Sequence, residues 1–97
     1  MSAKLAWVYI LADGPFGTLY LGMTSNLQQR MWQHKEEVFE GHTKKYGIKK
    51  LVWYVEFQSI KEAIAYEKRL KKWKRDWKID LIKKFNPEWR DLSEDMT

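Results

Sequence analysis

The sequence predicts an α+β fold built from two strands, a helix, a third strand and two further helices. Three observations support this order: turn residues separate two apolar runs, a later segment alternates in hydropathy, and helix-start signals precede apolar residues at helical spacing. Pairing of the strands gives a small three-stranded antiparallel sheet flanked by about three helices, in the order ββαβαα. The 97 residues are expected to form one domain over residues 1–92, with a frayed tail at 93–97.

The first two strands are predicted to form a hairpin, because the turn residues of 13–17 lie between two β-rich apolar runs. If Leu11 faces Thr18 across this turn, then Tyr9 faces Tyr20. A slip of one residue would place the two rings on opposite faces of the sheet, so this register is an assumption. Sheet stability alone also explains such a pair, because opposed aromatic residues commonly stabilise strands.

A helix is predicted after the second strand. Ser25 and Gln28 fit a capping box, and we expect a helix from about Asn26 toward Phe39 that ends at Gly41. Residues three or four positions apart share one face of it, namely Leu27, Arg30, Met31, His34 and Val38. An arginine and a histidine therefore lie on the side that should meet the sheet. Alternatively, the arginine snorkels from the edge and the histidine satisfies a local hydrogen bond.

The third strand is predicted over residues 51–57, after a loop over 40–50. Its period-two alternation places Leu51, Trp53, Val55 and Phe57 on one side and Val52, Tyr54 and Glu56 on the other.

The remaining chain is predicted to be helical. Ser59 and Glu62 form a second capping box, and helical propensity continues through Phe85. One unbroken helix would be about 39 Å long, which exceeds what a domain of this size covers. We therefore expect a break near Arg75 or Asp76, and an end to the last helix where Asn86 precedes proline.

Glu67 interrupts the apolar stripe of this helical region between Ile64 and Leu70. An unpaired carboxylate there would cost on the order of several kcal/mol. An ion pair with Lys71, worth only tenths of a kcal/mol, is one possible compensation. A bound cation, or Arg30 across the sheet, is the other.

The basic residues are concentrated in one segment. The net charge is +5, yet residues 61–84 alone hold ten basic residues against four acidic ones, a local excess of +6. Such a face favours a phosphate-rich partner, although a solvated helix surface is the alternative. The chain has no cysteine, which excludes disulfides, thiolate zinc sites and cysteine nucleophiles. The longest apolar run, residues 5–12, is far short of a membrane span, so we expect a soluble cytoplasmic protein without a membrane partner.

These residues, taken in order, resemble the GIY-YIG nuclease superfamily, which is named for two tripeptides on the first two strands of a small sheet. Tyr9 matches the tyrosine of the first tripeptide, and residues 20–22, Tyr-Leu-Gly, match the second. Arg30 and Glu67 fall at the positions of the family's arginine and glutamate. The likeness is strongest to short stand-alone bacterial members and extends over residues 7–92.

Three positions depart from the family pattern. Trp7 stands where the first tripeptide has glycine. Met23 follows the second tripeptide where DNA-repair incision subunits of the superfamily carry lysine, and His34 stands where those relatives carry tyrosine.

The resemblance implies an endonuclease that hydrolyses nucleic-acid phosphodiester bonds, with DNA as the expected partner and repair or recombination as the expected setting. It implies one divalent cation, Mg²⁺ or Mn²⁺, because a lone carboxylate suits these ions better than zinc. The implied catalytic residues are Tyr9, Tyr20, Arg30, His34 and Glu67, with Glu67 as the metal ligand. Nucleic-acid contacts are expected from Lys44, Lys45, Lys71, Lys72, Lys74 and Arg75, and supporting roles from Gly22 and Asn86.

Within this scheme Tyr20 is the expected general base, and either a neighbouring cation lowers the pKa of its phenol or His34 takes its proton. Trp73 and Trp77 are expected in the core rather than as platforms for bases. Two further functions are compatible with the sequence: a nucleic-acid-binding module of the same fold that does not cleave, and a protein-interaction scaffold whose basic helix meets an acidic partner.

Overall fold

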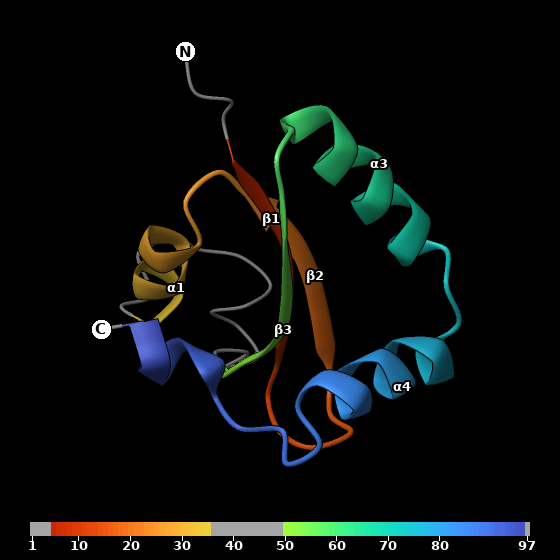
Figure 1. Ribbon diagram of the computed structural model, residues 1–97. Helices are drawn as coiled ribbons and strands as arrows, with labels where there is room; N and C mark the ends of the chain where they lie inside the picture. The colour runs from red at the N-terminus through yellow and green to blue at the C-terminus, as the bar shows by residue number, and fades with distance from the viewer. Residues whose placement is uncertain (1–4, 36–49, 97) are drawn as a thin grey trace.

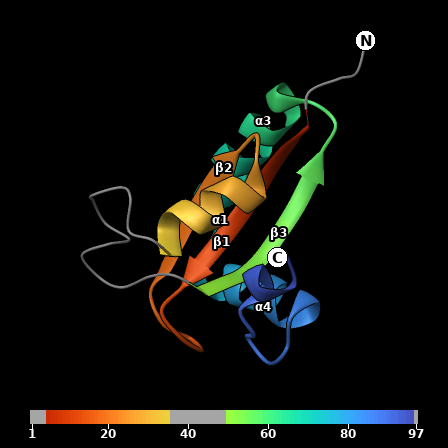
Figure 2. The same ribbon diagram turned by 90° about the vertical axis from the view of Figure 1, so that its left-hand side faces the viewer.

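A computed structural model describes residues 5–35 and 50–96. At its centre lies a three-stranded antiparallel sheet with the strand order β2-β1-β3. Helix α1 covers one face of the sheet, and α3 and α4 cover the other (Figures 1 and 2). The predicted α+β fold and its order ββαβαα are confirmed. The elements are β1 (Ala6–Ala12), β2 (Leu19–Thr24), α1 (Leu27–Lys35), β3 (Lys50–Phe57), α3 (Ile60–Lys71), α4 (Arg75–Phe85) and the 3-10 helix η1 (Leu92–Met96).

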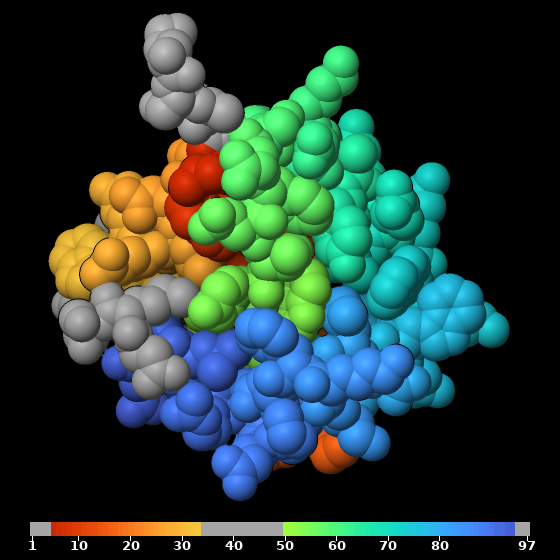
Figure 3. All heavy atoms as spheres, viewed as in Figure 1, coloured from red at the N-terminus to blue at the C-terminus, as the bar shows by residue number. Residues whose placement is uncertain are grey.

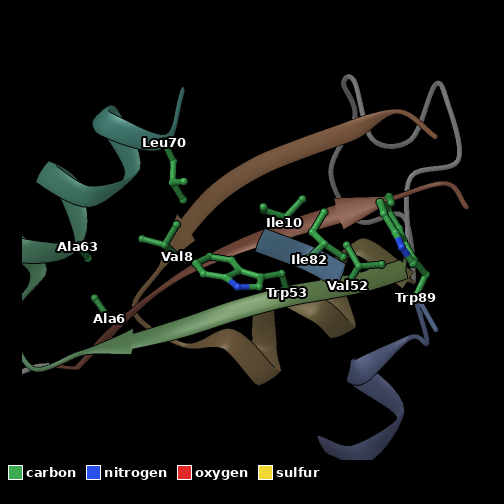
Figure 4. Close-up of a cluster of buried hydrophobic side chains, with 10 residues drawn as sticks. Ala6, Val8, Ile10, Val52, Trp53, Ala63, Leu70, Ile82 and Trp89 are labelled. Carbon is green, nitrogen blue, oxygen red and sulfur yellow. The ribbon is translucent and has the colours of Figure 1, made fainter. Parts of the chain in front are cut away.

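The face under α3 and α4 holds the larger hydrophobic cluster. Alternation along the central strand β1 directs its even-numbered residues to this face, where all of them are fully buried. Val8 and Ile10 pack there with Leu70 of α3 and Ile82 of α4 (Figure 4). Every residue of this cluster is apolar, so the face acts as a packing core.

The opposite face holds a smaller cluster beneath α1. Tyr9 and Leu11 of β1 are buried there against Leu27 and Met31 of α1 and Leu51 of β3. The predicted apolar side of the first helix therefore meets the sheet. Because β1 is the central strand and buried on both sides, its sequence is almost continuously apolar.

The β1–β2 register differs from the assumed one by two residues. Tyr9 pairs with Gly22, and Leu11 pairs with Tyr20. The connecting loop spans residues 13–18, where the Thr18 amide donates to the Asp13 carboxylate at 2.9 Å. A slip of two keeps every side chain on its face, so Tyr9 and Tyr20 lie on the same face but diagonally across the strands.

The expected alternation along β3 is wrong at its beginning. A register shift between Ile10 and Leu11 leaves Val52 without a pairing partner on β1. The extra residue reverses the alternation, so Val52 and Trp53 both join the core under α3 and α4. Leu51 consequently lies on the α1 face rather than beside Trp53.

The helix starts and the break between the last two helices lie within a few residues of the predicted places, whereas the predicted end of the first helix, toward Phe39 and Gly41, lies outside the described residues. Asn26, rather than Ser25, caps α1, with its side-chain oxygen accepting from the Gln29 amide at 3.1 Å. The predicted cap at Ser59 is confirmed, because its hydroxyl accepts from two amides of the first turn of α3. The break between α3 and α4 lies at residues 72–74, slightly before the expected place. None of the helices within 5–35 and 50–96 has the length and apolar character of a membrane span.

The C-terminal segment is fastened to β3 by side-chain hydrogen bonds. Asn86 ends α4 as predicted, is buried, and donates to the carbonyl oxygens of Val52 at 3.2 Å and Arg90 at 2.8 Å. The Asp91 carboxylate accepts from the Leu51 amide at 3.2 Å and from the Ser93 hydroxyl at 2.6 Å. The frayed tail was expected over residues 93–97, but with these bonds beside them residues 93–96 belong to η1.

Candidate active site

The Tyr9 ring occupies space that is open only because its neighbour on β2, Gly22, has no side chain. Its ring lies over Gly22, its direct partner on β2. A Cβ atom at position 22 would lie 2.5 Å from the Tyr9 hydroxyl oxygen and 2.6 Å from Cζ. Real Cβ contacts are never that short, so the position of the Tyr9 ring requires glycine there. This contact gives Gly22, expected only to support the site, a defined steric role.

Arg30 reaches Tyr9 from α1. Its neighbours along the helix, Leu27 and Met31, are buried against the sheet, which turns Arg30 toward the same face. The guanidinium donates a hydrogen bond to the phenolic oxygen of Tyr9. The arginine is half-buried rather than solvated at the edge, so the two residues form a unit.

The surroundings of Tyr9 raise the pKa of its phenol from the ordinary value near 10 to about 12. Burial is the main cause, since only 1% of Tyr9 is exposed and the charged form loses its hydration. The positive charge of Arg30 opposes this effect, while Tyr20 and Glu67 raise the pKa further. Tyr9 therefore remains a neutral phenol at physiological pH, and all three neighbours are close enough to act on it.

Tyr20 occupies the diagonal position next to Tyr9. It lies two residues before Gly22 on β2, faces the α1 side of the sheet and is half-buried at the rim of the smaller cluster. Diagonal neighbours across antiparallel strands are close enough for large aromatic side chains to interact. The predicted neighbourhood of the two phenols is therefore retained, although they are not directly opposed.

Glu67 approaches from α3, which packs on β1 and β2 from the opposite face. Its side chain is only 18% exposed, and its carboxylate lies 3.7 Å from the Lys71 ammonium, one turn along the helix. The i+4 ion pair is thus one compensation for this acid on the apolar stripe. The carboxylate also acts electrostatically on Tyr9, so it belongs to the same group of side chains.

Three of the expected site residues cannot be placed with the others. The backbone of His34 lies in α1, but its side chain is outside the described part of the chain. Lys44 and Lys45 fall within residues 36–49, which also lie outside it. The group that the structure brings together is Tyr9, Tyr20, Arg30 and Glu67.

The basic residues expected to contact nucleic acid fall into two kinds. Lys71, Lys72 and Lys74 are exposed where α3 ends and α4 begins. Arg75, although exposed, uses its guanidinium within the chain and donates to the carbonyl oxygens of Phe16 and Gly17, both at 2.6 Å. It fastens the β1–β2 hairpin to α4, a contact between residues about 59 positions apart that no local sequence pattern indicates.

The expectation that Trp77 lies in the core is wrong. Its side chain is 52% exposed on the first turn of α4. Trp73 is partly buried and packs against the larger cluster. A signal for the exposure of Trp77 was available, because Ile79 and Ile82 define the inner face of α4 and Trp77 lies about 200° from Ile79.

A shallow cavity of about 340 Å³ lies on the α1 face, at the beginning of that helix. The lining is mixed, with aromatic, amide and carboxylate side chains, and consists of Trp7, Asn26, Leu27, Gln28, Tyr54 and Glu56. It borders the row of Tyr9, because Trp7 precedes Tyr9 by two residues on β1 and Tyr54 pairs with Tyr9 from β3.

The donor chemistry of the site suits a hard divalent cation. Among the described residues no group of three histidine, cysteine, aspartate or glutamate side chains could enclose a metal ion. Glu67 is the carboxylate of the group around Tyr9. Mg²⁺ and Mn²⁺ keep several waters and accept further oxygens from a substrate phosphate, so one carboxylate fits these ions and does not fit structural zinc.

Comparison with known proteins agrees with the resemblance. A family model described as the GIY-YIG catalytic domain matches residues 5–80. The UPF0213 protein CPE1444 of Clostridium perfringens is 36% identical over 76 residues, which cover 78% of this chain and 81% of that protein. No solved structure matches the chain significantly. The matched range includes Tyr9, Tyr20, Arg30 and Glu67, whereas Asn86 lies beyond it.

Proposed function

Because this chain belongs to the GIY-YIG family, whose catalytic domain implies nuclease-type activity, we propose that it is an endonuclease that hydrolyses phosphodiester bonds in DNA with one Mg²⁺ or Mn²⁺ ion. One observation carries the proposal: a buried, neutral Tyr9 accepts a hydrogen bond from Arg30 within the influence of Tyr20 and Glu67. A packing core does not need this combination of phenol, guanidinium and carboxylate. Action in the cytoplasm, in repair or recombination, is part of the same proposal.

Glu67 would hold the cation. The ion would withdraw negative charge from the scissile phosphate and stabilise the leaving oxygen. Lys71, which pairs with Glu67, is more than half exposed, so it can swing away from the carboxylate at little cost.

Arg30 is assigned to the phosphate. A guanidinium has five N–H donors in a rigid fork, so it can keep its bond to Tyr9 and still bind a nonbridging phosphate oxygen. Negative charge on that oxygen grows as the ester is attacked, and a preorganised cation stabilises it without reorganising. Arg30 lies between the buried Leu27 and Met31 along α1, and its bond to Tyr9 would supply this preorganisation.

The two tyrosines receive different roles. Because the pKa of Tyr9 is raised to about 12, Tyr9 stays protonated and serves to orient Arg30 rather than to remove a proton. Tyr20 is half-buried at the rim of the site, where it is assigned to the attacking water as general base. His34, one turn after Arg30 on α1, is assigned as the acceptor of the proton from Tyr20.

A cleavage assay with matched variants tests the proposal. Wild-type protein is incubated with branched, flapped and single-stranded DNA in Mg²⁺ or Mn²⁺, beside Glu67→Gln, Arg30→Ala and Tyr20→Phe. We expect each variant to lose roughly 100-fold or more of the rate, in line with loss of a transition-state contact or a general base. Glu62→Gln, an exposed acid on the same helix, is the control and should cleave like wild type.

Two results would contradict the proposal. One is the absence of metal-dependent cleavage by wild type on every substrate. The other is full activity in Glu67→Gln. If the protein binds DNA with equal affinity in all variants but never cuts it, the non-cleaving binding module replaces the enzyme.

A further inference from the structure

Trp77 stands out among the residues that the nuclease site leaves unexplained. Single exposed apolar side chains are common on protein surfaces, so the 52% exposure of Trp77 is informative only together with the residues that surround it. It is also held in a defined orientation: its ring meets the Trp73 ring edge-on at 82°, with 6.0 Å between centroids. Trp73 is in turn anchored against the core. Trp77 is therefore an exposed ring that packs against a tryptophan anchored on the core.

The residues around Trp77 are basic. Lys74 lies over its ring, with 5.9 Å between the ammonium nitrogen and the ring centroid. We call the surface that joins the end of α3 to the start of α4 the basic corner; its exposed members are Lys68, Arg69, Lys71, Lys72, Lys74 and Trp77. Asp76 is the exposed acid within it, so the corner stays strongly positive. Figure 3 shows α3 and α4 forming one continuous surface.

From this juxtaposition we propose that Trp77 stacks on an unpaired base, so that the basic corner binds single-stranded nucleic acid. Cations follow the phosphate backbone, and an aromatic ring accepts the face of any base. In a duplex each base face is already covered by its neighbours, so an exposed tryptophan gains a stacking partner only from unpaired nucleotides. A single strand offers phosphates to the lysines and an open ring face to Trp77 in one repeating unit, whereas an acidic protein segment offers carboxylates without a regularly spaced ring.

The position of the basic corner connects it to the nuclease site. Lys71 lies one turn beyond Glu67 on α3 and pairs with it. A strand bound along the corner therefore reaches the carboxylate assigned to the cation. This inference deepens the proposed function, on which it rests for the direction of the strand. It adds that the preferred substrate has an unpaired stretch beside the scissile bond.

Binding without cleavage tests the inference separately from the nuclease activity. Fluorescence anisotropy with labelled oligo(dT), oligo(rU) and a blunt duplex of equal length is measured in EDTA, where metal-dependent cutting is absent. Trp77→Ala should weaken binding to the single strands roughly 5- to 150-fold, the fold-change that corresponds to loss of one base stack. Its effect on the duplex should be less than about twofold, since the lysine contacts to phosphate remain. The oligo(dT) and oligo(rU) arms show whether the natural strand is DNA or RNA.

Matched variants keep the result interpretable. Trp77→Phe retains an aromatic face and should keep most of the affinity, which also guards against a folding defect in Trp77→Ala. Trp32→Ala is the control, because Trp32 is similarly exposed, at 58%, but lies on α1 away from the corner. The part of the tryptophan fluorescence that oligo(dT) quenches should be lost in Trp77→Phe.

Three outcomes overturn the inference: equal losses on single strands and duplex, no loss on either, or competition by poly-glutamate that matches oligo(dT) and depends equally on Trp77. The last outcome would mark the corner as a site for an acidic protein. Because EDTA removes cleavage from the assay, a protein that never cuts DNA can still satisfy the inference. A protein that cuts normally can still refute it.

Discussion

The two faces of the sheet differ in what they do with the same central strand. The even-numbered residues of β1 are apolar, wholly buried and covered by α3 and α4. The odd-numbered residues include Tyr9, which is equally buried but faces Arg30. One face is therefore specialised for packing, while the other accepts a buried polar pair. The pleat of β1 thus separates a wholly apolar face from the face that carries the Tyr9–Arg30 pair, and Glu67 alone of the candidate catalytic residues comes from a helix on the apolar side.

A substitution in the core under α3 and α4 should lower the stability more than any other change considered below. Ile10→Ala removes a fully buried side chain from the central strand and should lower the free energy of unfolding by about 2–5 kcal/mol. Cleavage per folded molecule should be unchanged, because Ile10 points away from Tyr9. Urea denaturation and a cleavage assay at low temperature measure the two quantities. A loss of rate in the folded variant would show that the faces are not independent.

Titration of Tyr9 probes the other face. Its pKa is raised to about 12 in the folded chain against about 10 in the unfolded chain, so the unfolded chain loses its proton first. The stability contributed by the neutral phenol is complete below pH 10 and is lost as the pH rises through 12. The amount is up to about 3 kcal/mol. The free energy of unfolding is measured for wild type and for Tyr9→Phe across this pH range. The difference between the two gives the contribution of the Tyr9 phenol. A difference that stays constant above pH 10 would contradict the burial of Tyr9.

Gly22→Ala disturbs the chemical face through sterics alone. The added Cβ would overlap the buried Tyr9 ring, and we expect a loss of about 1–3 kcal/mol in stability, with reduced cleavage because the Tyr9–Arg30 pair shifts. Gly14→Ala is the matched control, since nothing lies within 4 Å of a Cβ there. Thermal unfolding compares the two. Equal melting temperatures of the two variants would contradict the steric role of Gly22.

The smallest effect concerns Lys71. Its ion pair with Glu67 is 3.7 Å long and its own side chain is 57% exposed, so Lys71→Gln should change the free energy of unfolding by less than about 0.5 kcal/mol. Chemical denaturation checks this value. A larger loss would mean that Lys71 is needed to keep Glu67 near the sheet, and so that the site depends on the pair.

The sequence predicted the elements well because their signals are local. Turn residues between two apolar runs revealed the first two strands, alternation revealed the third, and Ser59 marked the start of α3 correctly. The errors arose where geometry is decided by tertiary contacts. The β1–β2 register depends on how residues 13–18 fold, and the bulge at Val52 depends on pairing with β1, which no local pattern encodes.

The candidate site divides along the same line. Residue types and spacing indicated Tyr9, Tyr20, Arg30 and Glu67, and the structure brings these four together. The steric demand of Tyr9 on Gly22 was not visible in the sequence, because it depends on a register that the sequence left open. The positions of Ile79 and Ile82 indicate that Trp77 lies on the outer side of α4. The prediction was wrong because tryptophan is usually buried.

The tip of the β1–β2 hairpin is attached to two other parts of the chain. Arg75 grips two carbonyl oxygens of this tip, and Phe16, whose φ of 58° lies in the left-handed region, rests its ring on Trp89 at 5.2 Å. The tip is therefore clamped between α4 and the C-terminal segment. A displacement of the first turn of α4 would therefore be transmitted through the tip to β1 and β2, the strands that carry Tyr9 and Tyr20.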